Sequence, residues 1–159
     1  VSGIGRDMPR LELAKKFGAT RIINVEQEDV VEVVRKETNG ELCDVVVDVS
    51  GNPNAILKSV DCLHRQSTML LGGLTGDTTV TPMLMDKLVW NEIKLQGCFT
   101  ADNDATEAAL RIIEETKFPV EQMVSHIFPL KDIEHCIRSI GGEVPGTFPT
   151  KALINPAIG

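Results

Sequence analysis

The stretch CDVVVDVSGNPNAI, residues 43–56, decides the fold class. It contains a continuous apolar run over Asp44–Val49, and a run of this kind is typical of a strand that is buried on both faces of a parallel sheet. Gly51-Asn52-Pro53 breaks the strand, and a helix is expected over Asn54–Leu63. A strand, a short loop and a helix in this order form the repeating unit of α/β proteins.

The same alternation continues on both sides of this stretch. Upstream, we expect the end of a strand at Val1–Ile4, a helix between Asp7 and Gly18, a strand over Arg21–Val25 and a helix over Asp29–Thr38. Downstream, the expected segments are a strand Thr68–Leu71, a helix Pro82–Asn91, a strand Ile93–Phe99, a helix Asp104–Thr116, an extended segment Met123–Phe128, a helix Lys131–Ile140 and a strand Thr150–Ile154. The pattern predicts a doubly wound parallel sheet with helices on both faces.

Composition and charge exclude several classes of protein. The net charge of −7 disfavours nucleic acid or an anionic membrane surface as the main partner. No apolar run approaches the roughly 20 residues of a membrane span. The four cysteines form no C-x-x-C pair, and we interpret them as buried free thiols of a cytoplasmic protein. The chain starts without methionine in a strand-like stretch, so we expect it to be part of a longer protein.

Loops at the carboxyl ends of the strands are the expected ligand-binding positions, because open parallel sheets bind ligands at that edge. Four loops follow predicted strands in this way, at Gly3–Arg6, Val49–Gly51, Gly72–Asp77 and Cys98–Thr100. The remaining chemistry-bearing residues are less informative. His64, His126 and His135 stand isolated in the sequence, and Trp90 lies beside Leu88 and Val89, where we expect it to contribute to packing.

Five stretches follow one another along nearly the whole chain: RLELAKKFGATRIINV (10–25), CDVVVDVSGNPNAI (43–56), STMLLGGLTG (67–76), NEIKLQGCF (91–99) and IFPLKDIEHCIRSI with TKALINP (127–140 and 150–156). Together and in this order they resemble the zinc-type medium-chain dehydrogenases, which include alcohol, polyol and threonine dehydrogenases. The resemblance implies the C-terminal half of such an enzyme. Residues 1–122 would be a Rossmann domain without its first strand and Gly-rich turn, and residues 123–159 would return to the catalytic domain.

Two departures from the family pattern carry information. Residues 3–8 only half match G-x-G-x-x-G, and we interpret them as the end of the second strand of the domain. The family's zinc ligands belong to its N-terminal half, so the resemblance implies that no residue of this chain is catalytic or binds metal. A mid-sheet strand that is missing from the chain would leave two additional sheet edges. We expect the isolated chain to be inactive and to bind no zinc.

The resemblance also implies a set of cofactor-binding residues. Gly3 or Gly5 stands where the family normally has an acid for the adenosine ribose, and Arg6 beside it could accommodate the 2′-phosphate of NADP. Asp7 could still serve the ribose, so NAD and NADP both stay open. The other implied contacts are Val49, Ser50 and Gly51 at the adenosine and pyrophosphate, Gly72, Gly73, Leu74, Cys98, Phe99 and Thr100 at the nicotinamide, and Lys151 at the pyrophosphate.

Each of these residues also has a plainer structural interpretation. The glycines could simply form turns, Arg6 and Lys151 could be solvated, and the Cys98 thiol could pack in the core. By resemblance, the favoured function is hydride transfer between a small secondary alcohol and NAD(P), with zinc bound outside this segment. The alternatives are a non-catalytic Rossmann module that senses nucleotide and a Rossmann methyltransferase. Because Ile93–Phe99 should be the outer strand, we also expect a homodimer or homotetramer that forms through it.

Overall fold

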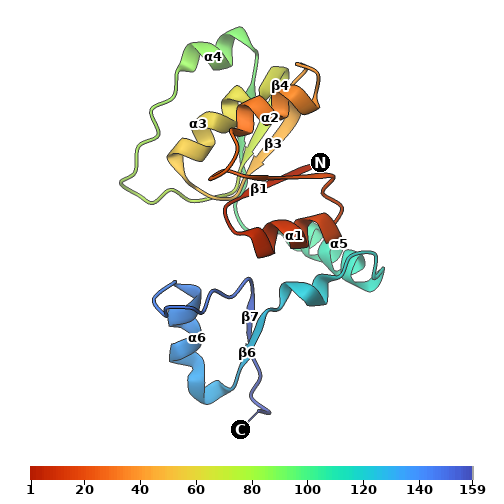
Figure 1. Cartoon of the computed structure of the whole chain (residues 1–159), viewed down its shortest axis with the longest axis vertical. Helices are drawn as coiled ribbons and strands as arrows, with labels where there is room; N and C mark the ends of the chain where they lie inside the picture. Colours follow the sequence, from red (N-terminus) through yellow and green to blue (C-terminus); the bar gives the residue numbers. More distant parts are fainter. Residues whose placement is uncertain (159) are drawn as a thin grey trace. The chain divides into compact units, whose positions relative to one another are not determined.

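Strands and helices alternate along the chain in the computed structural model, which describes residues 1–158 (Figure 1). Every predicted strand and helix is present, with shifted ends. The main differences are that β4 begins at Leu63 rather than Thr68, and that short 3₁₀ turns occupy Val120–Met123 and Leu130–Asp132. The elements are β1 Ser2–Gly5, α1 Met8–Lys16, β2 Arg21–Asn24, α2 Val30–Glu37, β3 Cys43–Asp48, α3 Pro53–Asp61, β4 Leu63–Leu71, α4 Met85–Trp90, β5 Lys94–Gly97, α5 Asn103–Glu114, β6 His126–Phe128, α6 Ile133–Ile140 and β7 Ala152–Ile154.

Three helices begin directly after a strand-end loop because a polar side chain caps them. Asp7 Oδ1 accepts the Arg10 N–H at 2.8 Å, and Asp29 Oδ1 accepts the Val31 N–H at 2.9 Å. Asn52 Oδ1 accepts the N–H groups of both residues 54 and 55 at the start of α3. Such caps satisfy amide groups that have no partner within the helix, and they set where α1, α2 and α3 start.

The described residues divide into two compact units, each of which is considered by itself. One contains Val1–Ile22 and the described part of 103–159, and the other is Ile23–Asp102. In the first unit α1 packs on β1, and α6 lies beside the parallel pair β6–β7 (Figure 1). The predicted boundary between residues 122 and 123 concerns the longer protein and stays a prediction.

The second unit is built on a three-stranded parallel sheet in the order β3-β4-β5. Its register places Val46 beside Met69 and Met69 beside Leu95. β5 is an outer strand, as predicted. Within residues 1–158, β1 is paired only with β2 and β3 only with β4.

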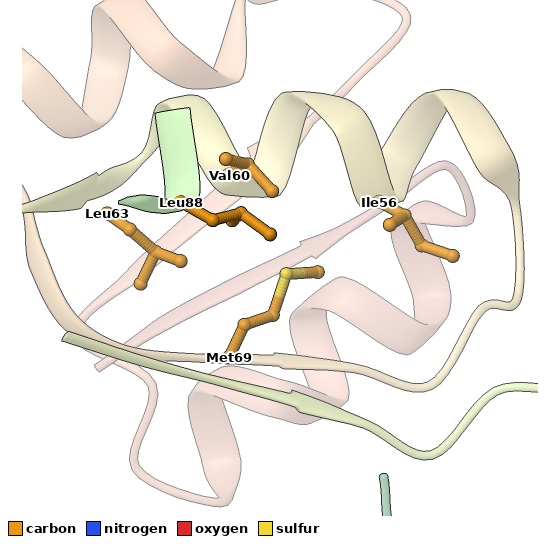
Figure 2. Close-up of a cluster of buried hydrophobic side chains, with 5 residues drawn as sticks. All are labelled: Ile56, Val60, Leu63, Met69 and Leu88. Carbon is orange, nitrogen blue, oxygen red and sulfur yellow. The ribbon is translucent and has the colours of Figure 1, made fainter. Parts of the chain in front are cut away.

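The core of this unit lies between the sheet and helices α3 and α4. Figure 2 shows Met69 pointing from β4 toward Ile56 and Val60 of α3, with Leu88 of α4 beside them. All are buried, and Met69 is fully enclosed. Burial of side chains of this size stabilises the unit by roughly 1.5–3 kcal/mol each.

The other face of the sheet carries exposed side chains. Val45 and Val47 point away from the core and are 54% and 57% exposed, so the prediction of a strand buried on both faces is wrong for this chain. The physical reason is that α3 and α4 pack on the face that carries Val46 and Met69. Successive side chains of a strand point to opposite faces, which leaves the two valines on the uncovered side.

Among the described residues, no helix combines the length and the apolar character needed to cross a lipid bilayer.

Candidate functional site

The loops after β3, β4 and β5 meet at one edge of the sheet. Because the three strands are parallel neighbours, their carboxyl ends lie on the same side. Backbone hydrogen bonds continue past the strand ends: Cys98 N donates to Leu71 O at 2.9 Å. Nine of the predicted cofactor-binding residues are thereby brought together, namely Val49, Ser50, Gly51, Gly72, Gly73, Leu74, Cys98, Phe99 and Thr100.

Asp48, the last residue of β3, organises the first two of these loops. Its buried carboxylate accepts the Ser50 hydroxyl at 2.6 Å through Oδ1 and the Gly51 N–H at 3.1 Å through Oδ2. Its backbone carbonyl accepts the N–H groups of Gly72 at 2.8 Å and Gly73 at 3.2 Å. Asp48 was not among the predicted site residues, although an acid at the end of an otherwise apolar run was a signal that could have identified it.

The two loops approach each other backbone to backbone at Gly51 and Gly73. Gly51 has φ +63°, and a Cβ there would lie 2.2 Å from the Leu74 carbonyl oxygen. A Cβ on Gly73 would lie 2.2 Å from the Gly51 amide nitrogen. Both glycines are therefore required by the close packing of the two loops. At Gly72 a Cβ would make only ordinary contacts, the nearest with Cys98 Sγ at 3.5 Å.

Three large apolar side chains at this edge are directed to solvent. Val49, Leu74 and Phe99 are 78%, 78% and 79% exposed, one from each of the three loops. The neighbouring Ser50 and Thr100 are exposed as well. Apolar walls with a few polar groups are typical of sites that bind small molecules. The edge thus offers surface for a flat, partly apolar ligand.

Cys98 is exposed, which corrects its interpretation as a core residue. It lies beyond the end of β5, where its thiol meets the Leu71 carbonyl oxygen at 3.5 Å. The buried interpretation is confirmed for Cys62 and Cys136, while Cys43 is half-buried. Burial raises the pKa of the Cys62 thiol to about 11, which keeps it protonated and unreactive at neutral pH.

The end of β1, with Gly3, Gly5 and Arg6, belongs to the other unit. A Cβ on Gly3 would lie 3.2 Å from the Cβ of Ala14, and one on Gly5 would lie 3.5 Å from Leu11 Cδ2. Side chains at both positions would thus point at α1. Arg6 follows on the surface, and the neighbouring Asp7 uses Oδ1 to cap α1.

Lys151 lies in the same unit as the end of β1, directly before β7. Its side chain is exposed, and its carbonyl oxygen accepts the Ser125 N–H at 3.0 Å and the Ser125 hydroxyl at 3.3 Å. The structure fixes the backbone of Lys151 in this way and leaves its ammonium group at the surface.

Two interpretations of isolated side chains need correction. His64 Nε2 lies 2.8 Å from Asp44 Oδ1, so this histidine is not isolated. The Asp44 carboxylate raises the pKa of His64, and the pKa of Asp44 is lowered in turn. Trp90 is mostly exposed on α4, where Leu88 is the residue that faces the core. Among residues 1–158, no group of three or more His, Cys, Asp or Glu side chains could hold a metal ion.

Comparison with known proteins links this chain to one family. The family described as "Zinc-binding dehydrogenase" matches residues 1–115. The probable alcohol dehydrogenase of Mycobacterium tuberculosis is 30% identical over 159 residues, which cover 98% of this chain and 43% of that protein. The L-threonine 3-dehydrogenase of Caldanaerobacter subterraneus is 33% identical over 141 residues, covering 85% and 40%. The chain thus spans about two fifths of the length of these relatives.

Solved structures support the fold. An alcohol dehydrogenase from Thermotoga maritima superimposes with a TM-score of 0.87 at 19% identity, over 98% of this chain and 43% of that one. A short chain alcohol dehydrogenase from Escherichia coli CFT073, complexed with the cofactor NADH, gives a TM-score of 0.78 at 18% identity, over 92% and 42%. These likenesses show the Rossmann-like α/β fold that the sequence predicts.

Proposed function

Because the chain belongs to the zinc-binding dehydrogenase family, we propose that it is the nicotinamide-cofactor-binding part of a zinc-dependent alcohol or polyol dehydrogenase. When bound, the cofactor supplies or accepts the hydride that is exchanged with a small secondary alcohol. The task of this chain is to bind and orient the cofactor. The observation that carries the proposal is the meeting of the loops after β3, β4 and β5 at one sheet edge.

The residues at this edge fit a dinucleotide cofactor. Exposed Val49, Leu74 and Phe99 offer apolar contact to flat rings, and Ser50 and Thr100 offer hydroxyl groups. The glycines keep side chains away from the centre of the edge, so that polar backbone groups stay within reach of a ligand. The described residues do not fit a zinc site, and we place the zinc ligands outside this chain.

For the adenosine end of the cofactor, we propose that Arg6 pairs with the 2′-phosphate of NADP. Support comes from Gly3 and Gly5, whose side-chain positions face α1, and from Asp7, one of whose oxygens already caps α1. Lys151 is exposed and available to a pyrophosphate. We propose that the complete enzyme uses NADP at least as well as NAD.

Beyond the cofactor site, we propose that residues 123–159 return to a catalytic domain. The supporting observation is an apolar stripe on α6: Ile133, Ile137 and Ile140 are exposed, whereas Cys136 and Ser139 face inward. Apolar stripes at helical spacing are usually covered in a folded enzyme. The four free cysteines favour a reducing compartment, and we propose the cytoplasm.

The direct test uses the complete gene product that carries this chain. Binding of NADH and NADPH would be measured by fluorescence, and alcohol oxidation by the appearance of reduced cofactor with L-threonine, sorbitol and simple secondary alcohols. We expect binding of a reduced cofactor and oxidation of at least one alcohol. Binding without oxidation would favour the non-catalytic nucleotide-sensing module, and absence of binding would overturn both.

A further inference from the structure

We propose, on the basis of the function proposed above, that Asp48 is a positioning residue of the cofactor site. It would act through the loops after β3 and β4, which it fastens to each other and to the end of β3. Its carboxylate holds the first loop and its carbonyl oxygen holds the second. No direct contact between Asp48 and the cofactor is required for this role.

The carboxylate shapes the loop that leads into α3. Ser50 donates its hydroxyl to Asp48 Oδ1 at 2.6 Å, and the same hydroxyl oxygen accepts the Asn52 N–H at 3.1 Å. Asn52 is the residue that caps α3. A continuous series of hydrogen bonds therefore connects the end of β3 to the start of α3. The exposed residues Val49 and Ser50 lie in the loop that these bonds hold in place.

The carbonyl oxygen of Asp48 fixes the neighbouring loop at the same point. It accepts the N–H groups of Gly72 and Gly73, directly after β4. Gly51 and Gly73 then pack so closely that neither position has room for a Cβ. With no free space between them, the two loops must move together, and any displacement of Asp48 would move Val49 and Leu74 at once.

The chemistry of the site requires a carboxylate at this position. Two donors, the Ser50 hydroxyl and the Gly51 N–H, point at the two oxygens of Asp48. An asparagine has the same shape but only one acceptor oxygen, and its amide group would face one of these donors. Because the Asp48 side chain and Gly51 are both buried, a Gly51 N–H that loses its acceptor would find no water to replace it.

Asp48→Asn and Asp48→Ala test the proposal in the complete gene product. We expect the KM for the nicotinamide cofactor to rise about tenfold, the size of one lost hydrogen bond to a charged group, while kcat changes less. Amide hydrogen exchange should become faster at residues 49–51 and 72–74 and stay unchanged in α2. A cofactor KM that is unchanged in both variants, at a temperature where both are folded, would overturn the proposal.

Ser67→Ala is the matched control for a general loss of stability. Ser67 is buried in the same sheet, and its hydroxyl donates to the His64 carbonyl oxygen at 2.7 Å, outside the loops of the cofactor edge. This variant should lower the melting temperature without raising the cofactor KM. An equal rise in KM in Ser67→Ala and Asp48→Asn would show a general effect of stability and overturn the positioning role.

A measurement on the unchanged protein covers the case in which the Asp48 variants do not fold. The amides of Gly51, Gly72 and Gly73 should exchange slowly although they lie in loops, and fast exchange at all three would overturn the proposal. If the unchanged protein bound neither NADH nor NADPH, the proposed function would fail together with this inference. Unchanged cofactor affinity in Asp48→Asn would overturn only the inference.

Discussion

His64 is held between two acceptors, and this arrangement favours its charged form. Its Nε2 faces Asp44 Oδ1, and its Nδ1 meets the carbonyl oxygen of Arg65. Both contacts are satisfied only when both ring nitrogens carry a hydrogen, as they do in the imidazolium form. The pair therefore raises the pKa of His64 above its ordinary value of 6.5 and lowers the pKa of Asp44 below its ordinary value of 3.8.

These shifts predict a pH window for the stability that the pair contributes. The His64 contribution is fully present below pH 6.5 and is lost as the pH rises through its raised pKa. The Asp44 contribution is present above pH 3.8 and is lost as the pH falls through its lowered pKa. His64→Gln should therefore lower the midpoint of urea unfolding at weakly acidic pH and have little effect at alkaline pH.

His126→Gln provides the control for the His64 prediction, because the His126 ring contacts the Ser125 hydroxyl instead of a carboxylate. The difference in midpoint between His64→Gln and the unchanged chain should shrink as the pH rises, and the His126→Gln difference should not follow this course. If the His64→Gln difference in midpoint were the same at weakly acidic and at alkaline pH, it would contradict a stabilising pair between charged His64 and Asp44.

Arg6 is the residue that we expect to decide between NADP and NAD. In Arg6→Ala of the complete gene product, kcat/KM for NADP should fall by the equivalent of about 1.5–3 kcal/mol, because a charge-assisted contact to phosphate is lost. The value for NAD should hardly change. Lys15→Ala removes another surface cation from the same region, one that is paired with Glu12, and should affect neither cofactor. An equal loss with both cofactors, or a strong preference of the unchanged enzyme for NAD, would refute this role.

At the scale of whole elements, the position where a helix starts is tied to the position where the preceding strand ends. Each of α1, α2 and α3 begins at a capping side chain that immediately follows a strand-end loop. The loops are therefore short and have little freedom, which suits a surface that must present backbone groups to a ligand in a fixed arrangement. Gly51 is a position where two such loops approach each other so closely that a Cβ would have no room.

Gly51→Ala should be among the most destabilising single changes in this unit. The φ of +63° is unfavourable for alanine, and the new methyl group would overlap the Leu74 carbonyl oxygen. We expect a loss of about 3 kcal/mol in the free energy of unfolding, as the sum of backbone strain and overpacking. Gly72→Ala, where a methyl group meets only ordinary contacts, should stay within about 1 kcal/mol. Equal melting temperatures of the two variants would contradict this account.

At the scale of the whole molecule, β5 is paired only with β4 among residues 1–158, so its other side is unpaired. Cys98 N donates toward β4, and N–H groups alternate in direction along a strand, so the Gln96 amide also faces β4 and the Leu95 amide faces outward. Edge strands with free donors need to be covered. Our proposal is that a second copy of the protein pairs with this edge around a two-fold axis.

Leu95→Pro tests the proposed dimer, because proline removes the outward N–H while the ladder to β4 keeps its donors. Sedimentation of the complete gene product should show a dimer or tetramer for the unchanged protein and smaller species for this variant. Leu95→Ala keeps the N–H and loses only side-chain packing, so it should preserve the assembly. A monomeric unchanged protein, or dissociation of Leu95→Ala to the same extent, would count against pairing through β5.

The order of strands and helices, and the sheet edge at which the loops after β3, β4 and β5 meet, followed from the sequence alone. Capping residues such as Asp7, Asp29 and Asn52 act within a few residues, and apolar runs mark strands by the same local rule. Parallel strands in turn require that the loops after β3, β4 and β5 share one edge. Local patterns were therefore sufficient to predict that the loops carrying nine of the proposed cofactor-binding residues lie at one edge of the sheet.

Only the tertiary structure decided which surfaces are covered and which distant residues meet. Val47, Cys98 and Trp90 are apolar or soft side chains whose exposure depends on elements packed against them, and a local pattern carries no information about those elements. Asp44 and His64 are brought together because the register of β3 on β4 places them side by side. The double role of Asp48 likewise arises from a neighbouring strand, and sequence patterns determine secondary structure far better than they determine such long-range pairing.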